Sequence, residues 1–182
     1  MSKFILMWMA VYFLFCFPSL KAQGEQKGEK KHQLTINGKA LVYMPPASEN
    51  AEGPSLMAGV GVKYDFTEHL SAELCGEWTS YKVPQGIKTL IPITASLIYN
   101  FLPSASPFQT YVGGGLGLYL SNIEGVNSST FGYHVLIGLG WSPKGDFYLK
   151  CEAKYAIPDY KEPSAGGLSI GGGISGSMST TF

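Results

Sequence analysis

Arginine is missing from this chain of 182 residues, so all 13 of its basic residues are lysines. A lysine ammonium is a point charge, and the chain therefore has no guanidinium to clamp a phosphate or carboxylate through two parallel hydrogen bonds. Charged residues make up only 14% of the sequence, whereas a typical soluble domain has about 25%. The 13 acidic residues balance the lysines, and this lack of a basic excess argues against nucleic acid as a partner.

Cysteine is also scarce, with three residues in the whole chain. No pair of cysteines or histidines has the spacing of a metal site, and we expect neither a metal nor another cofactor. The glycine-rich residues 113–117 lack the helix and the lysine of a phosphate-binding loop. His134 is the one histidine within an expected strand; Gly132 and Leu136 on the same face cannot act as nucleophiles, although Ser175 could approach it across strands. We therefore predict that the protein is not an enzyme.

Long hydrophobic runs are limited to residues 4–17, near the N-terminus. This run is shorter than the about 20 residues that span a bilayer as a helix, and its length suits the core of a signal peptide. We place cleavage after Ala22, so that residues 1–22 form the signal peptide, residues 23–33 a flexible periplasmic lead-in and residues 34–182 the folded domain. The mature chain is thus expected to be exported.

What the sequence does contain is a two-residue repeat of apolar with small or polar side chains. In residues 131–141 the odd positions run from Phe131 to Trp141 and are all apolar or aromatic, whereas the even positions are mostly glycine and include His134. A period of two predicts a β-strand with two unlike faces. Ten steps of about 3.3 Å, tilted by about 40°, rise about 25 Å, which matches the apolar band of an outer-membrane barrel.

Eight such segments follow one another along the mature chain. They cover residues 34–44, 56–66, 70–81, 90–101, 108–120, 131–141, 147–157 and 168–182. The connections alternate, long at residues 45–55, 82–89, 121–130 and 158–167 and short at residues 67–69, 102–107 and 142–146. An even strand number with alternating connections is typical of outer-membrane barrels. We therefore predict an all-β fold, an eight-stranded antiparallel transmembrane up-and-down β-barrel.

Aromatic residues lie at both ends of the apolar series of these strands. At the ends assigned to the periplasm they are Phe66, Phe101, Phe108, Trp141, Phe147 and Phe182, and at the opposite ends Trp78, Phe131, Tyr133 and Tyr155. Two rows of rings are typical of the girdles that mark the two interfaces of a membrane. The alternative is that aromatic residues are simply common in strands, but strand propensity does not place rings at strand ends on one face.

The opposite face of the same strands carries charge and glycine. Its four lysines and four carboxylates are Lys39, Lys63, Asp65, Glu73, Glu77, Lys150, Glu152 and Lys154. An eight-stranded barrel has an interior just wide enough for its own side chains. We therefore predict a lumen closed by a neutral charge network, without a through-pore. Cys75 shares the inward face and Cys151 the outward face, which predicts two free thiols separated by the barrel wall.

Two neighbouring segments carry a family resemblance. Residues 91–101 and 108–118 resemble the fourth and fifth strands of OmpW-like outer-membrane proteins, in which a proline-threonine strand ends in Tyr-x-Phe and the next strand carries Tyr-Val-Gly. Similar Tyr-Val-Gly motifs occur in OmpA-like and OmpX-like barrels. The terminal Phe182 resembles the signal that the barrel-assembly machinery reads, and the resemblance implies that machinery as a partner.

The resemblance also implies a location and a function. It places the chain in the cell outer membrane, in contact with membrane lipid and lipopolysaccharide, where it would help small apolar molecules cross through a lateral exit into lipid. Pro92 matches the prolines beside the lateral gate of the family, and proline cannot donate to a strand ladder. The alternative for Pro92 is an ordinary proline that follows a loop in the first turn of a strand.

Two other functions remain open at this point. One is a surface adhesin or a structural, lipopolysaccharide-interacting barrel of OmpX type. The other is a soluble lipocalin-type carrier in the periplasm, whose outer face would have to be the one that we assign to the lumen. Along the last strand that face is glycine, serine and threonine, which suits a narrow lumen better than a surface in water.

Overall fold

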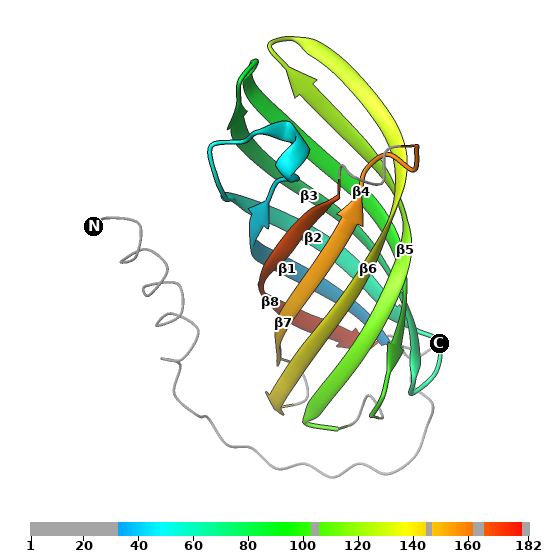
Figure 1. The fold of residues 1–182 in the computed structure, drawn as a ribbon. Coiled ribbons are helices and arrows are strands. Elements are labelled where there is room, and N and C mark those ends of the chain that lie inside the picture. Colours follow the sequence, from blue (N-terminus) through cyan, green and yellow to red (C-terminus); the bar gives the residue numbers. More distant parts are fainter. Residues whose placement is uncertain (1–32, 103–105, 145–146, 162–165, 180–182) are drawn as a thin grey trace, which may run out of the picture.

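A computed structural model describes residues 33–102, 106–144, 147–161 and 166–179. Its eight strands are β1 Gln33–Met44, β2 Ser55–Asp65, β3 Leu70–Val83, β4 Gly86–Asn100, β5 Phe108–Ile123, β6 Val126–Lys144, β7 Phe147–Ile157 and β8 Gly167–Ser179. They pair antiparallel in sequence order, and β1 pairs with β8 to close the barrel (Figure 1). The predicted fold class is confirmed. The predicted signal peptide, residues 1–22, and nearly all of the lead-in lie outside the described residues.

The two ends of the barrel differ in their connections. We call the end that carries the β1–β2, β3–β4, β5–β6 and β7–β8 connections the mouth, and the end where β1 begins and β8 ends the base. One short helix, η1 Ala47–Glu49, lies in the β1–β2 connection. Among the described residues no helix has the length and apolarity needed to cross a membrane.

The alternation predicted from the sequence determines which side chains face outward. In β4 every second residue from Leu90 to Asn100 is buried, and the residues between them are exposed. The exposed positions of all strands are dominated by large hydrophobic side chains; Leu116 and Leu56, for example, are 70% and 76% exposed. Covering such a band with water would cost about 25 cal/mol for each Å² of apolar surface. The outer face is therefore adapted to lipid.

Two of the predicted connections are wrong. Residues 82–89 and 121–130, which we expected to be long loops, are mostly strand, because β3 continues to Val83, β4 begins at Gly86, β5 continues to Ile123 and β6 begins at Val126. Glu124 and Gly125 have φ of 48° and 89°, and two successive positive φ values make the two-residue turn that suits the twist of a hairpin.

The longer hairpins make the mouth uneven. β6 pairs with β7 only from Tyr133 onward, so its first residues, 126–132, extend past the end of β7. Figure 1 shows the β5–β6 hairpin, in yellow-green, rising above the strands of the opposite wall. One wall of the barrel, built from β3 to β6, therefore stands taller than the other.

Candidate functional site: the lumen and the β3–β4 seam

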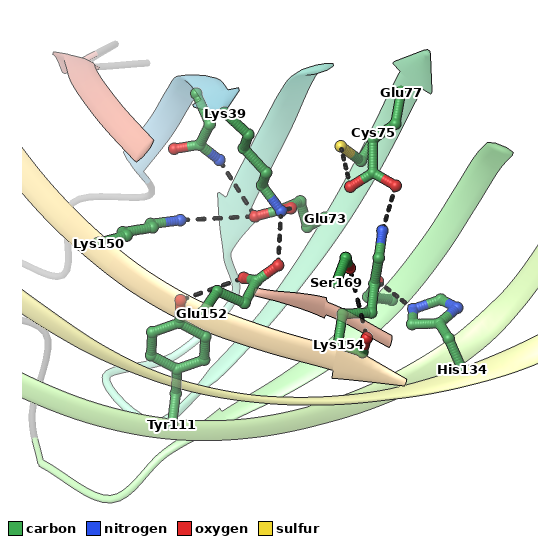
Figure 2. A network of polar contacts seen from close by, with 12 residues as sticks. Lys39, Glu73, Cys75, Glu77, Tyr111, His134, Lys150, Glu152, Lys154 and Ser169 are labelled. Carbon is green, nitrogen blue, oxygen red and sulfur yellow. Dashed lines mark hydrogen bonds and ion pairs between the residues drawn. The ribbon is translucent and has the colours of Figure 1, made fainter. Parts of the chain in front are cut away.

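Glu73 is the centre of a buried cluster in the lumen. Its carboxylate pairs with the ammonium of Lys39 from β1, lies 3.5 Å from Nζ of Lys150 from β7, and accepts a hydrogen bond of 3.1 Å from Asn37. Lys39 also pairs with Glu152 at 3.2 Å. Figure 2 shows these side chains converging from different strands. The cluster thus ties three strands together across the lumen.

Tyr111 extends the same cluster. Its hydroxyl donates to Glu152 over 3.1 Å, and its ring lies under the ammonium of Lys150, 5.9 Å from the centroid. The ring occupies the space beside Gly138, where an added Cβ would collide with it. A small residue in β6 therefore makes room for a large one in β5.

The remaining predicted charges form two separate pairs. Glu77 of β3 pairs with Lys154 of β7 and accepts a weak hydrogen bond of 3.8 Å from the Cys75 thiol (Figure 2). Lys63 pairs with Asp65 at 3.0 Å on the same strand. The structure thus divides the predicted network into three groups, and all eight side chains are buried.

These groups leave little open space. The cavity beside the central cluster, lined by Asn37, Lys39, Lys150 and Glu152 among others, has a volume of about 10 Å³, which is room for one water molecule. Asn37 and Tyr111 were not in the predicted network, although the period of two places both on the inward face. Ion pairs and their hydrogen-bonding partners therefore fill the middle of the barrel.

A Ser–His pair lies in the same lumen. Oγ of Ser96 and Nε2 of His134 are 2.7 Å apart, and both residues are buried. Nδ1 of His134 has no hydrogen-bond partner among the described residues, so no carboxylate orients the ring. The sequence analysis did not identify Ser96 as a neighbour of His134, because Ser96 reaches the imidazole from a different strand, β4. Among the described residues no group of three or more histidine, cysteine or acidic side chains is placed to hold a metal ion.

Toward the mouth the lumen becomes apolar, which the sequence analysis did not anticipate. The inward side chains form a cluster that we call the mouth cluster: Leu41, Tyr43, Met57, Tyr81, Val83, Leu90, Tyr119 and Ala156. All are less than 10% exposed. The hydroxyl of Tyr119 is buried and has no hydrogen-bond partner among the described residues. The sequence signal that could have identified the mouth cluster is the same period of two, because it places these residues on the inward face.

The seam between β3 and β4 is interrupted at Pro92. Pairing runs to Gly76 and Ile93, resumes at Thr79 and Leu90 in the same register, and is absent in between, where Glu77 and Trp78 face Pro92 and Ile91. On its other side Pro92 pairs with Tyr119 without a break. Since proline has no N–H, a break on one side of its strand is the expected result.

The position of Pro92 excludes one of its two interpretations. It lies well inside β4, which begins at Gly86, and its ring is buried on the lumen side. The interpretation as a proline in the first turn of a strand is therefore wrong. The break has the mouth cluster and the Glu77–Lys154 pair on its lumen side, and the exposed side chains of Trp78 and Ile91 on its outer side.

The predicted girdle residues within the described side chains lie on the outer face. They are Phe66, Phe101, Phe108 and Trp141 near the base, and Trp78, Phe131, Tyr133 and Tyr155 toward the mouth. The rings of Phe108 and Trp141 stack at 6.4 Å. The side chain of Phe147 and the whole of Phe182 lie outside the described part. Cys75 is buried and Cys151 exposed, and both are free, as the faces of their strands predict.

No protein-family model matches this sequence, and neither does any curated protein. Solved structures do match. Neisserial surface protein A is 18% identical with a TM-score of 0.60, covering 84% of this chain and all of that one. The N-terminal barrel domain of OprF from Pseudomonas aeruginosa is 17% identical with a TM-score of 0.59, covering 82% and 100%.

The outer membrane protein OprG from Pseudomonas aeruginosa is also similar, at 13% identity and a TM-score of 0.57, covering 81% of this chain and 97% of that one. At these identities the shared property is the fold. The chain is a small eight-stranded closed barrel of the kind found in transmembrane barrels.

Proposed function

We propose that this protein is an OmpW-like barrel of the outer membrane that lets small apolar molecules pass between its mouth and the surrounding lipid. The exposed apolar band with aromatic rings at both ends supports a place in a membrane. The similarity to OprG and the resemblance of residues 91–118 to OmpW-like strands support the outer membrane and the subfamily.

The break in the seam beside Pro92 is the observation that carries this function. The ion pairs of Glu73, Glu77 and Glu152 block a straight path from mouth to base. An apolar solute that enters the mouth meets apolar side chains first and finds the break at their lower edge. It can leave there sideways, into lipid, without passing the charges.

The test is uptake of a small aromatic hydrocarbon such as naphthalene by Gram-negative cells that express the protein. Pro92→Thr restores a backbone donor, so we expect it to close the seam and to reduce uptake to the level of cells without the protein. Pro84→Thr is the matched control, since Pro84 lies in the turn of the same hairpin, outside both strands. Equal uptake by Pro92→Thr and wild type, with both folded, contradicts the proposal.

A surface adhesin is the second candidate, and the tall β5–β6 hairpin favours it. Residues 126–132 of β6 reach past β7. Near the tip, half-buried Asn122 and exposed Asn127 are joined by a hydrogen bond of 2.7 Å. Such an edge can pair with an extended partner. Loss of cell binding on shortening this hairpin, with uptake unchanged, would favour adhesion over transport.

We also propose that the barrel is not an enzyme and not a soluble carrier. The Ser96–His134 pair has no orienting acid in the described residues and is enclosed by the lumen wall, whereas a catalytic serine needs access to substrate. The apolar outer face argues against a carrier in water. Release of fatty acid from lipopolysaccharide or phospholipid that disappears in Ser96→Ala would overturn the first statement.

A further inference from the structure

The connection between β1 and β2 folds over the mouth cluster. Residues 45–54 contain η1, and Pro46 is buried and Ala51 packs against the cluster. Figure 1 shows this connection, in cyan, bending from the end of β1 toward β3. Although the mouth cluster lies at the open end of the barrel, Met57 is only 3% exposed. A cover of this kind explains the low exposure.

Glu49 fastens the cover to the tall wall. Its carboxylate accepts a hydrogen bond of 2.8 Å from the Tyr81 hydroxyl and pairs at 2.8 Å with Nζ of Lys88. Tyr81 and Lys88 are paired residues of β3 and β4, so one carboxylate bridges both strands of the hairpin.

A second acidic residue of the same connection serves as a comparison. Glu52 pairs with Lys82 at 3.6 Å, but their side chains are 71% and 68% exposed, against 19% and 17% for Glu49 and Lys88. Solvent screening makes an exposed pair weak. Glu52 contributes instead through its backbone N–H, which donates to the carbonyl oxygen of Lys82 over 3.1 Å. The side chain that holds the connection closed is therefore Glu49.

Tyr119 indicates which kind of solute could bind among the mouth-cluster side chains. Its ring packs on the inner face of β5, where a Cβ on Gly117 would lie 2.8 Å from it, and its unpaired hydroxyl is buried among apolar side chains. A buried hydroxyl without a partner is unfavourable, so a ligand that supplies the missing hydrogen bond gains affinity there. Tyr119 is also the residue that pairs with Pro92 on the β5 side of β4, opposite the broken seam.

We propose that residues 45–54 are a lid, latched by Glu49 to Tyr81 and Lys88, over the mouth cluster, whose packed side chains form a binding chamber when the lid opens. The chamber takes a small apolar molecule with a single hydrogen-bonding group, such as an alcohol, whose polar group meets the Tyr119 hydroxyl. The choice of solute rests on the proposed function; the lid and its latch do not.

Thiol labelling of a chamber residue tests the lid without any transport. In the full chain, Cys16→Ser, Cys75→Ser and Cys151→Ser remove the natural thiols, and Met57→Cys places one under the lid. We expect this parent to react slowly with a water-soluble maleimide in nanodiscs, and the added Glu49→Ala to speed labelling at least tenfold. Glu52→Ala is the matched control and should stay within twofold of the parent.

Two outcomes overturn the lid. One is a Glu49→Ala variant that labels at the parental rate. The other is a parent whose thiol at position 57 reacts as fast as the thiol of an Ala47→Cys variant, since Ala47 is exposed. The chamber would then be open already. Heat-dependent gel mobility checks that each variant is folded, and Tyr81→Phe, which removes one hydrogen bond only, replaces Glu49→Ala if the latter does not fold.

Protection from labelling tests the chamber. In the Glu49→Ala background, n-octanol should slow labelling of the thiol at position 57 more than n-octane does, at equal concentrations in the bilayer. Tyr119→Phe should abolish this difference. Equal protection by the two solutes with Tyr119 present overturns the assigned ligand class. Rapid labelling of Glu49→Ala together with absent naphthalene uptake would refute the proposed function and leave the lid standing.

Discussion

The Glu77–Lys154 pair offers the sharpest test of the barrel interior. Both side chains are almost completely buried, at 0% and 4% exposure, and the pair joins β3 to β7 across the lumen. Glu77→Ala leaves the Lys154 ammonium in the lumen without its carboxylate. Breaking a buried pair in this way typically costs 3 to 5 kcal/mol, so we expect a loss of about 4 kcal/mol in the free energy of unfolding.

A double variant distinguishes the cost of leaving one buried charge without its partner from the contribution of the ion pair itself. In Glu77→Leu with Lys154→Met neither charge of this pair remains, and replacing a buried ion pair by apolar side chains is often neutral or stabilising. We therefore expect most of the stability to return. The pair lies over Gly59, where an added Cβ would approach Cγ of Glu77 to 2.7 Å, so this glycine makes room for the side chain at position 77.

The assay is urea unfolding in detergent, followed by tryptophan fluorescence and by heat-dependent gel mobility. Glu124→Ala in the exposed β5–β6 turn is the control and should change the free energy of unfolding by less than about 0.5 kcal/mol. Equal, small losses for Glu77→Ala and Glu124→Ala would show that water reaches Lys154. A double variant as unstable as Glu77→Ala would show that packing, not charge, explains the loss.

Two further predictions concern the barrel wall. Gly138→Ala should displace the Tyr111 ring and lower stability by about 1 to 3 kcal/mol, whereas Gly76→Ala, with nothing within 4 Å of its added Cβ, should be nearly neutral in the same unfolding assay. Cys151 should react with a lipid-soluble maleimide in the folded protein and Cys75 should not, and mass spectrometry without reductant should find no bridge between them; a bridge would contradict the opposite faces of their strands.

The period of two in the sequence predicted the faces of the strands, but it could not predict partners across the lumen. Each inward charge was identified from its own strand alone. That Glu73 meets Lys39 and Lys150, from β1 and β7, depends on strand stagger and barrel diameter. These are properties of the closed sheet, and no local pattern contains them.

The two extended hairpins were missed for a different reason. Residues 121–130 are rich in serine and asparagine, a composition that is typical of loops. In the structure their backbone pairs fully from Ser121 with Ser128 to the turn at Glu124 and Gly125. Ladder hydrogen bonds with a neighbouring hairpin outweighed weak strand propensity, which is a tertiary effect. The sequence signal that could have found the turn is the Glu-Gly pair between two hydrophobic residues.

The height of the seam break along the barrel explains how the fold can tolerate it. A backbone group without a hydrogen bond costs several kcal/mol in the hydrocarbon core of a membrane, so a break there would be selected against. Trp78, which flanks this break, belongs to the aromatic row toward the mouth, and such rows lie at the level of lipid headgroups. Water at that level can satisfy the freed carbonyl groups of β3. The lateral exit that we propose requires a level of the wall that water can reach, and the break beside Pro92 lies at that level.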